Sequence, residues 1–278
     1  MVFESIKLDW MEHRPFIVLF FGFAYSLLGY FLATIFFGNT VSIAMLFLTT
    51  LFAVPSLIRI LDVEERIESK EGLRHFFHNH KEIFEVYLFL FLGIFLGYIA
   101  LALGSANMPT LFDFQMKFLA RQESLSGELI QSFFTRPLQP SPTHVMAILS
   151  NNLLVSAICF LLSVFYGAGA IFLLVLNASI FSSFIVFVSQ QLARVSGDAI
   201  VIFGFFSIHL VPEVAGFLTA AIAGGVVSKA ILTEKVFSEG FKNVVRDAIA
   251  LLLLSMVFIM LGAVLEVYVT APLFYHYF

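Results

Sequence analysis

Residues 199–232 read AIVIFGFFSIHLVPEVAGFLTAAIAGGVVSKAIL, an apolar stretch interrupted by a histidine, a proline and a glutamate. About 20 apolar residues suffice for a helix to cross the hydrocarbon core, so this stretch is long enough to span a membrane. Pro212 lacks a backbone N–H and crowds the turn before it, and we therefore predict one crossing whose helix is broken near Pro212. Ionisable side chains are costly in lipid, which makes His209 and Glu213 candidate functional residues.

The composition of the whole chain points the same way. Of 278 residues, 60% are hydrophobic and 12% are charged, whereas soluble domains average about 45–50% and about 25%. Besides residues 199–232, the chain has six further apolar runs, at 15–37, 40–61, 84–105, 146–165, 168–192 and 248–272. The sequence therefore predicts an all-α, polytopic helical membrane protein with about seven transmembrane crossings.

The charges indicate which partners and which orientation to expect. Fifteen Lys and Arg against 19 Asp and Glu give a net charge of −4, which argues against nucleic acid and leaves membrane lipid as the first expected partner. With seven crossings, the side that holds the amino terminus carries most of the Lys and Arg. The positive-inside rule then predicts a multi-pass cell-membrane protein with a cytoplasmic amino terminus and an outside carboxyl terminus.

Two polar segments divide the chain into three regions. Residues 1–105 form a predicted three-helix membrane region with a charged cytoplasmic helix at 62–85. Residues 106–144 are predicted to be an extracytoplasmic loop with amphipathic helices along the membrane surface, which serves either as a docking arm or as a cap over the bundle. Residues 145–278 form the predicted membrane core.

Polar residues within the crossings are few and belong to the second half of the chain. They are His209, Glu213, Glu266, Asn151, Asn152 and Asn177. Their positions along the crossings predict one buried polar cluster. His209 with the two glutamates has the chemistry to hold a divalent metal such as zinc or to relay protons. The alternative is that these side chains only brace neighbouring helices.

Small residues recur at every fourth position on two of the crossings. Gly216, Ala220, Gly224 and Ser228 share one helix face, and Gly93 and Gly97 share another. Such faces allow two helix backbones to approach closely. They predict tight helix packing and leave a homodimer as an open alternative.

The order of these features in residues 147–272 resembles the stage II sporulation protein M family of integral membrane proteins. Two positions depart from the family pattern, because Ala178 follows Asn177 and Leu210 follows His209 where members often have glycine. The resemblance rests on the following residues: Asn151-Asn152 opening a span, Gly167-Ala168-Gly169 at the next turn, Asn177, His209 with Glu213 before an Ala/Gly-rich helix, Glu266 and Pro272. The resemblance implies a membrane scaffold, because the named member serves in an assembly that remodels peptidoglycan.

Three functions follow from these observations. The favoured one is a non-enzymatic scaffold or anchor for envelope or cytoplasmic protein partners. The alternative is a transporter or channel for a small cation, a proton or a polar solute that uses the polar cluster as its site. A second alternative is an intramembrane metal-dependent hydrolase, in which His209, Glu213 and Glu266 hold the metal.

Overall fold

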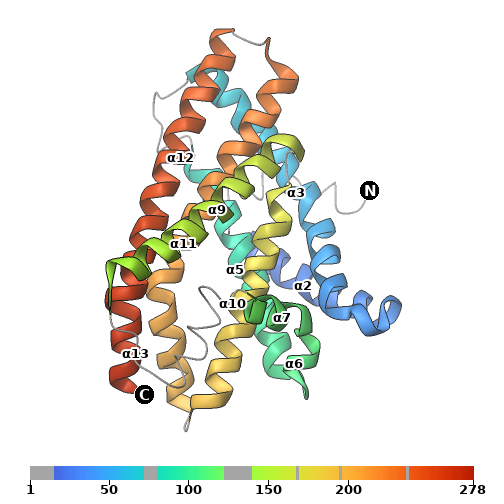
Figure 1. Ribbon diagram of the computed structural model, residues 1–278. Coiled ribbons are helices and arrows are strands. Elements are labelled where there is room, and N and C mark those ends of the chain that lie inside the picture. Colours follow the sequence, from blue (N-terminus) through green and yellow to red (C-terminus); the bar gives the residue numbers. More distant parts are fainter. Residues whose placement is uncertain (1–15, 72–79, 122–139, 167–168, 194–195, 236–237) are drawn as a thin grey trace.

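The structure is a computed structural model that describes residues 16–71, 80–121, 140–166, 169–193, 196–235 and 238–278. Every regular element in these ranges is helical (Figure 1), which confirms the predicted all-α class. In chain order the elements are α2 (Phe16–Phe36), the 3₁₀ turn η1 (Gly38–Thr40), α3 (Val41–Glu71), α5 (Lys81–Gly104), α6 (Met108–Leu111), α7 (Asp113–Arg121), α9 (Pro142–Tyr166), α10 (Ala170–Leu192), α11 (Ser196–Thr233), α12 (Glu239–Leu265), the π turn η3 (Glu266–Thr270) and α13 (Ala271–Tyr277).

Six of the described helical runs are long and apolar enough to cross a membrane. They are α2, α5, α9, α10, α11 and the continuous run from α12 through α13. The chain is therefore a multi-pass membrane protein by the length and composition of its helices. The second predicted crossing, 40–61, falls on α3, whose apolar part is the shorter segment Val41–Pro55. Seven crossings and the orientation from the Lys and Arg count stay predictions.

The predicted break at Pro212 is wrong, because α11 runs without interruption from Ser196 to Thr233. Proline removes only the one backbone hydrogen bond to the carbonyl of Ile208. A helix in lipid tolerates this loss when neighbouring helices support it, and α9 and α12 both pack against α11.

The irregular turn lies instead in the last crossing. Residues Glu266–Thr270 form a π turn that is followed at once by α13, where Pro272 occupies the first turn. A proline at 272 would crowd the carbonyl of Tyr268 in a regular α-helix, and a π turn relaxes this contact by inserting one extra residue. The helix distortion therefore lies beside Pro272, and not beside Pro212 as predicted.

The two polar segments also differ from the prediction. The charged residues after position 61 continue α3 to Glu71, and α5 begins at Lys81; residues 72–79 of the predicted helix 62–85 lie outside the described residues. In the loop 106–144, α7 buries one face, with Gln115 and Leu119, against α3 and α10; its orientation relative to the membrane surface stays a prediction. Residues 122–139 of this loop lie outside the described residues.

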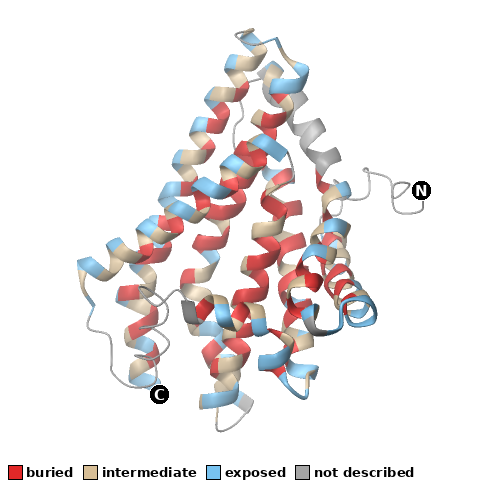
Figure 2. Cartoon of the chain, turned by 45° about the vertical axis from the view of Figure 1, so that its right-hand side comes forward, coloured by how far each residue is buried: buried red, intermediate tan, exposed pale blue. Residues whose placement is uncertain are grey.

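The helices pack through the small residues that the sequence singled out. A Cβ atom on Gly93 would collide with the backbone carbonyl of Leu19, so α2 and α5 lie in direct backbone contact. A Cβ atom on Gly224 would meet the carbonyl of Phe160, which brings α11 against α9. Figure 2 shows buried residues along the inner faces of these helices and exposed ones outside. Both small-residue faces serve packing within the chain, and the homodimer stays a prediction that no longer rests on them.

Candidate functional site

Three helices, α9, α11 and the run from α12 through η3, enclose a group of buried polar side chains. Helix α11 packs against both others, and α9 crosses obliquely over them in Figure 1. We define the polar cluster as the buried Asn152 on α9, His209 and Glu213 on α11 and Thr270 on η3, together with the half-buried Glu266 on η3. Because α11 is continuous, His209 and Glu213 stand four residues apart on one helix face.

Glu213 connects α11 to α9. Its side chain is only 4% exposed, and the Nδ2 atom of Asn152 donates a hydrogen bond of 2.7 Å to its Oε1 atom. Asn151 donates a longer bond of 3.4 Å to the Oδ1 atom of Asn152. A carboxylate or carboxyl group in this position needs such a partner, because lipid offers none.

His209 connects α11 to the π turn. Its Nδ1 atom lies 3.1 Å from the Oγ1 atom of Thr270, and the Thr270 hydroxyl donates to the carbonyl of Phe205 at 3.3 Å. This hydroxyl donates to the backbone, so the imidazole Nδ1 is the donor in the first bond and Nε2 is left as an acceptor. The ring of Phe206 meets the imidazole edge-on at a centroid distance of 5.9 Å and shields it from lipid.

Glu266 opens the π turn and lies close enough to Glu213 for the two carboxyl groups to interact electrostatically. Repulsion between two negative charges is strong in a medium of low dielectric constant. Glu213 on α11 and Glu266 on η3 therefore influence one another although they belong to different helices.

Close packing seals the polar cluster on the α12 side. A Cβ atom on Gly262 would collide with Cγ of Glu213 and lie 3.3 Å from the carbonyl oxygen of His209. One layer away, the Ser255 hydroxyl donates to the Gly216 carbonyl at 2.8 Å and lies 3.0 Å from the Ser156 hydroxyl. These contacts tie α9, α11 and α12 together by hydrogen bonds and by direct backbone approach.

Asn177 is the predicted site residue that the structure leaves apart. It lies on α10, two helical turns before Phe184, whose ring contacts Phe206 of α11. Residues seven apart share a helix face, so Asn177 is on the α11-facing side of α10. Its buried Nδ2 atom has no hydrogen-bond partner among the described residues. It therefore makes no hydrogen bond to the polar cluster.

The polar cluster does not assemble a metal-ligand set. Within the ranges that the structure describes, no group of three or more His, Cys, Asp or Glu residues is placed to hold a metal ion. Nδ1 of His209 bonds to Thr270, and Oε1 of Glu213 accepts from Asn152. The divalent-metal site of His209, Glu213 and Glu266, and the hydrolase that depends on it, stay predictions.

Several residues of this region were missed from the sequence. Thr270 follows Glu266 by four residues and Ser156 follows Asn152 by four, so each shares a helix face with a residue that was singled out. That spacing was the available signal. A second buried network was also missed: Ser42 donates to Oε1 of Gln115 at 2.7 Å, and Nε2 of Gln115 donates to Ser179 at 3.2 Å.

Comparison with known proteins adds one finding. The family model described as SpoIIM: Stage II sporulation protein M matches residues 86–271, which is more than half of the chain and extends from α5 into α13. The polar cluster lies entirely within the matched region. Neither the curated proteins nor the solved structures contain a match to this chain.

Proposed function

The chain belongs to the stage II sporulation protein M family, and from this membership and the closed geometry of the polar cluster we propose that it is a non-enzymatic membrane scaffold that anchors protein partners. The observation that carries the proposal is the set of hydrogen bonds between Asn152, Glu213, His209 and Thr270. These groups bond to one another across three helices, which is the arrangement expected of a brace.

A brace of this kind suits a scaffold because it fixes the positions of the helix ends. The α9, α11 and α12 unit is held by the polar cluster and by the serine pair Ser156 and Ser255. At one end of the chain's helices, α7 is joined to α3 and α10 through Gln115. At another, Asn243 of α12 donates to the carbonyl of Ser69 in the charged end of α3. Partners would therefore meet surfaces that do not shift relative to the bundle.

Photo-crosslinking in the native membrane tests the scaffold. A benzophenone amino acid replaces Pro109 on α6 or Lys70 at the charged end of α3, both of which are exposed. The control carries the same group at Leu253, which is 59% exposed on the apolar surface of α12. We expect discrete protein adducts at position 109 or 70 and none at 253. Identical adduct patterns at all three positions would count against the proposal.

Transport of protons or small cations is the second candidate function, and one observation favours it. Glu213 and Glu266 are two acidic groups in apolar helical runs that lie near enough to interact electrostatically, and Glu266 stands in a π turn. Paired acids in a membrane are typical of proton pathways, and π turns are frequent at functional sites. Proteoliposomes with an imposed pH gradient test this function. Flux that disappears in Glu213→Gln but persists in Asn177→Leu would replace the scaffold by a transporter.

A further inference from the structure

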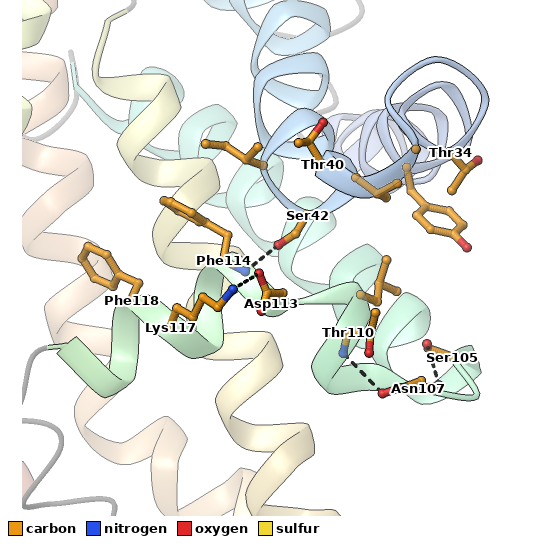
Figure 3. A pocket seen from close by; sticks show the side chains of 15 residues that line it. Thr34, Thr40, Ser42, Ser105, Asn107, Thr110, Asp113, Phe114, Lys117 and Phe118 are labelled. Atoms are coloured by element: carbon orange, nitrogen blue, oxygen red, sulfur yellow. Dashed lines mark hydrogen bonds and ion pairs between the residues drawn. The ribbon is translucent and has the colours of Figure 1, made fainter.

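A cavity lined by both apolar and polar side chains lies away from the polar cluster, at the end of the bundle where α2 and α5 end and α3 begins. Its volume is about 590 Å³, and the η1 turn, α6 and α7 complete its walls. This volume is within the range typical of small-molecule sites. Figure 3 shows Thr34 and Thr40 on one wall and Ser105, Asn107 and Thr110 on the other, with Asp113 and Lys117 between the two walls.

The cavity carries no net charge. Asp113 and Lys117 are its two charged lining residues, and they pair with each other at 2.8 Å between Nζ and Oδ2. A site for an isolated phosphate needs an excess of cationic donors, and a site for an ammonium group needs an excess of anionic acceptors. The lining provides neither excess, so its chemistry fits a neutral polar group.

The hydrogen bonds within the cavity wall determine which donors and acceptors remain free for such a group. The hydroxyl protons of Thr34 and Thr40 are donated to the carbonyls of Phe31 and Phe37, so these two oxygens face a ligand as acceptors. Oδ1 of Asn107 accepts from the backbone N–H of Thr110, so its Nδ2 is left as a donor. One wall of the cavity thus presents hydrogen-bond acceptors and the other presents a donor. A hydroxyl group can both donate and accept, so a ligand with several hydroxyl groups can bond to both walls.

The surroundings of the cavity indicate that the ligand has an apolar part. Between and beside the lining residues of α2 and η1 stand Phe31, Phe36 and Phe37, which are 59%, 71% and 48% exposed. Two candidate membrane spans end at the cavity, so these rings are at the boundary where acyl chains meet headgroups. A molecule with hydroxyl groups in the cavity and acyl chains against these rings would satisfy both surfaces.

We propose that this cavity binds the uncharged, hydroxyl-rich headgroup of a membrane lipid, with Thr34 and Asn107 as hydrogen-bonding residues together with Tyr30, which lines the cavity one helical turn before Thr34 on α2. The proposal does not rest on the polar cluster that carries the scaffold function, although α6 and α7, which complete the cavity, also form one of the surfaces proposed for protein partners. The lipid is held by its headgroup, and its acyl chains remain in the bilayer against α2.

Native mass spectrometry of the detergent-solubilised full chain tests the proposal. The probes are a monoglucosyl diacylglycerol and a phosphatidylcholine with the same acyl chains. We expect the glucolipid to be retained preferentially. The double variant Tyr30→Phe, Thr34→Val keeps both shapes but removes two polar groups, and it should lose about fivefold or more of that retention. Thr233→Val is the matched control, because its hydroxyl makes the same type of bond to a backbone carbonyl outside the cavity.

The other outcomes are equally defined. Equal retention of the two lipids, or an unchanged preference in a folded double variant, would overturn the proposal. Displacement of the glucolipid by the same concentration of methyl glucoside would show a soluble sugar site and overturn the lipid assignment. If the double variant does not fold by circular dichroism, Asn107→Asp replaces it. That variant keeps the Oδ1 acceptor for Thr110, loses the Nδ2 donor, and should again lower glucolipid retention.

Discussion

Replacing Asn152 by leucine removes the hydrogen bond that joins α9 to Glu213 while keeping the side-chain volume similar. Glu213 is 4% exposed, so its Oε1 atom would be left buried without the partner that now lies at 2.7 Å. Orphaning a buried polar group costs about 1–3 kcal/mol. We therefore expect Asn152→Leu to lower the free energy of unfolding by about 1–3 kcal/mol. Glu213→Leu should cost a similar amount.

The double variant shows whether the two residues act as a pair. If they do, the double variant Asn152→Leu, Glu213→Leu should lose less free energy of unfolding than the two single variants lose together, and the difference should be about 1 kcal/mol or more. Unfolding is followed by far-ultraviolet circular dichroism during titration of mixed micelles with dodecyl sulfate. Asn177→Leu is the matched control, because the Nδ2 atom of Asn177 has no partner among the described residues, and it should be close to neutral. The pairing would be refuted if the losses of unfolding free energy in the two single variants were strictly additive, or if Asn177→Leu lost as much as Asn152→Leu.

Three further predictions concern packing. Gly262→Ala places a Cβ atom against Cγ of Glu213 and should lower the free energy of unfolding by about 1–3 kcal/mol. At the control position Gly204 a Cβ atom meets nothing within 4 Å, so Gly204→Ala should be neutral or stabilising in the same dodecyl sulfate titration. Gln115→Leu removes the hydrogen bonds from α7 to Ser42 and Ser179, and amide hydrogen exchange in α7 should accelerate at least tenfold. The control Lys117→Gln breaks only an exposed ion pair worth about 0–1 kcal/mol and should leave the exchange rates nearly unchanged. Equal exchange rates in the two variants would contradict the role given to Gln115. Pro212→Ala restores a backbone donor inside a continuous helix and should keep or raise both helicity and stability; a clear loss of stability would mean that α11 depends on a break at this position.

Apolar length predicted the membrane-spanning helices well because a helix must satisfy its own backbone in lipid, whatever its neighbours are. The same reasoning predicted that Asn152, Glu213 and Glu266 would meet, since each is expensive to leave alone in an apolar helix. Their partners were harder to find. Thr270 and Ser255 donate to backbone carbonyls of α11, and apart from the four-residue spacing of Thr270 from Glu266 nothing in the sequence marks them.

The sequence also could not predict which of the two prolines distorts its helix. Pro212 and Pro272 have the same local chemistry, but α11 is packed on both sides by α9 and α12, and it stays regular. The last crossing absorbs Pro272 through a π turn. Which helix distorts depends on tertiary packing, and residue type alone does not contain that information. Likewise, the amphipathic pattern of residues 106–144 does not predict the hydrogen bonds by which Gln115 joins Ser42 and Ser179.

The most direct test of the brace is a distance measurement in lipid bilayers. Solid-state rotational-echo NMR on protein labelled with ¹⁵N in asparagine side chains and ¹³C in glutamate carboxyl groups reports whether the Nδ2 atom of Asn152 lies beside the carboxyl group of Glu213. The hydrogen bond of 2.7 Å predicts strong dephasing of one asparagine signal that is absent from Asn152→Leu. Dephasing that is the same in the parent and in Asn152→Leu would contradict the hydrogen bond on which the scaffold depends.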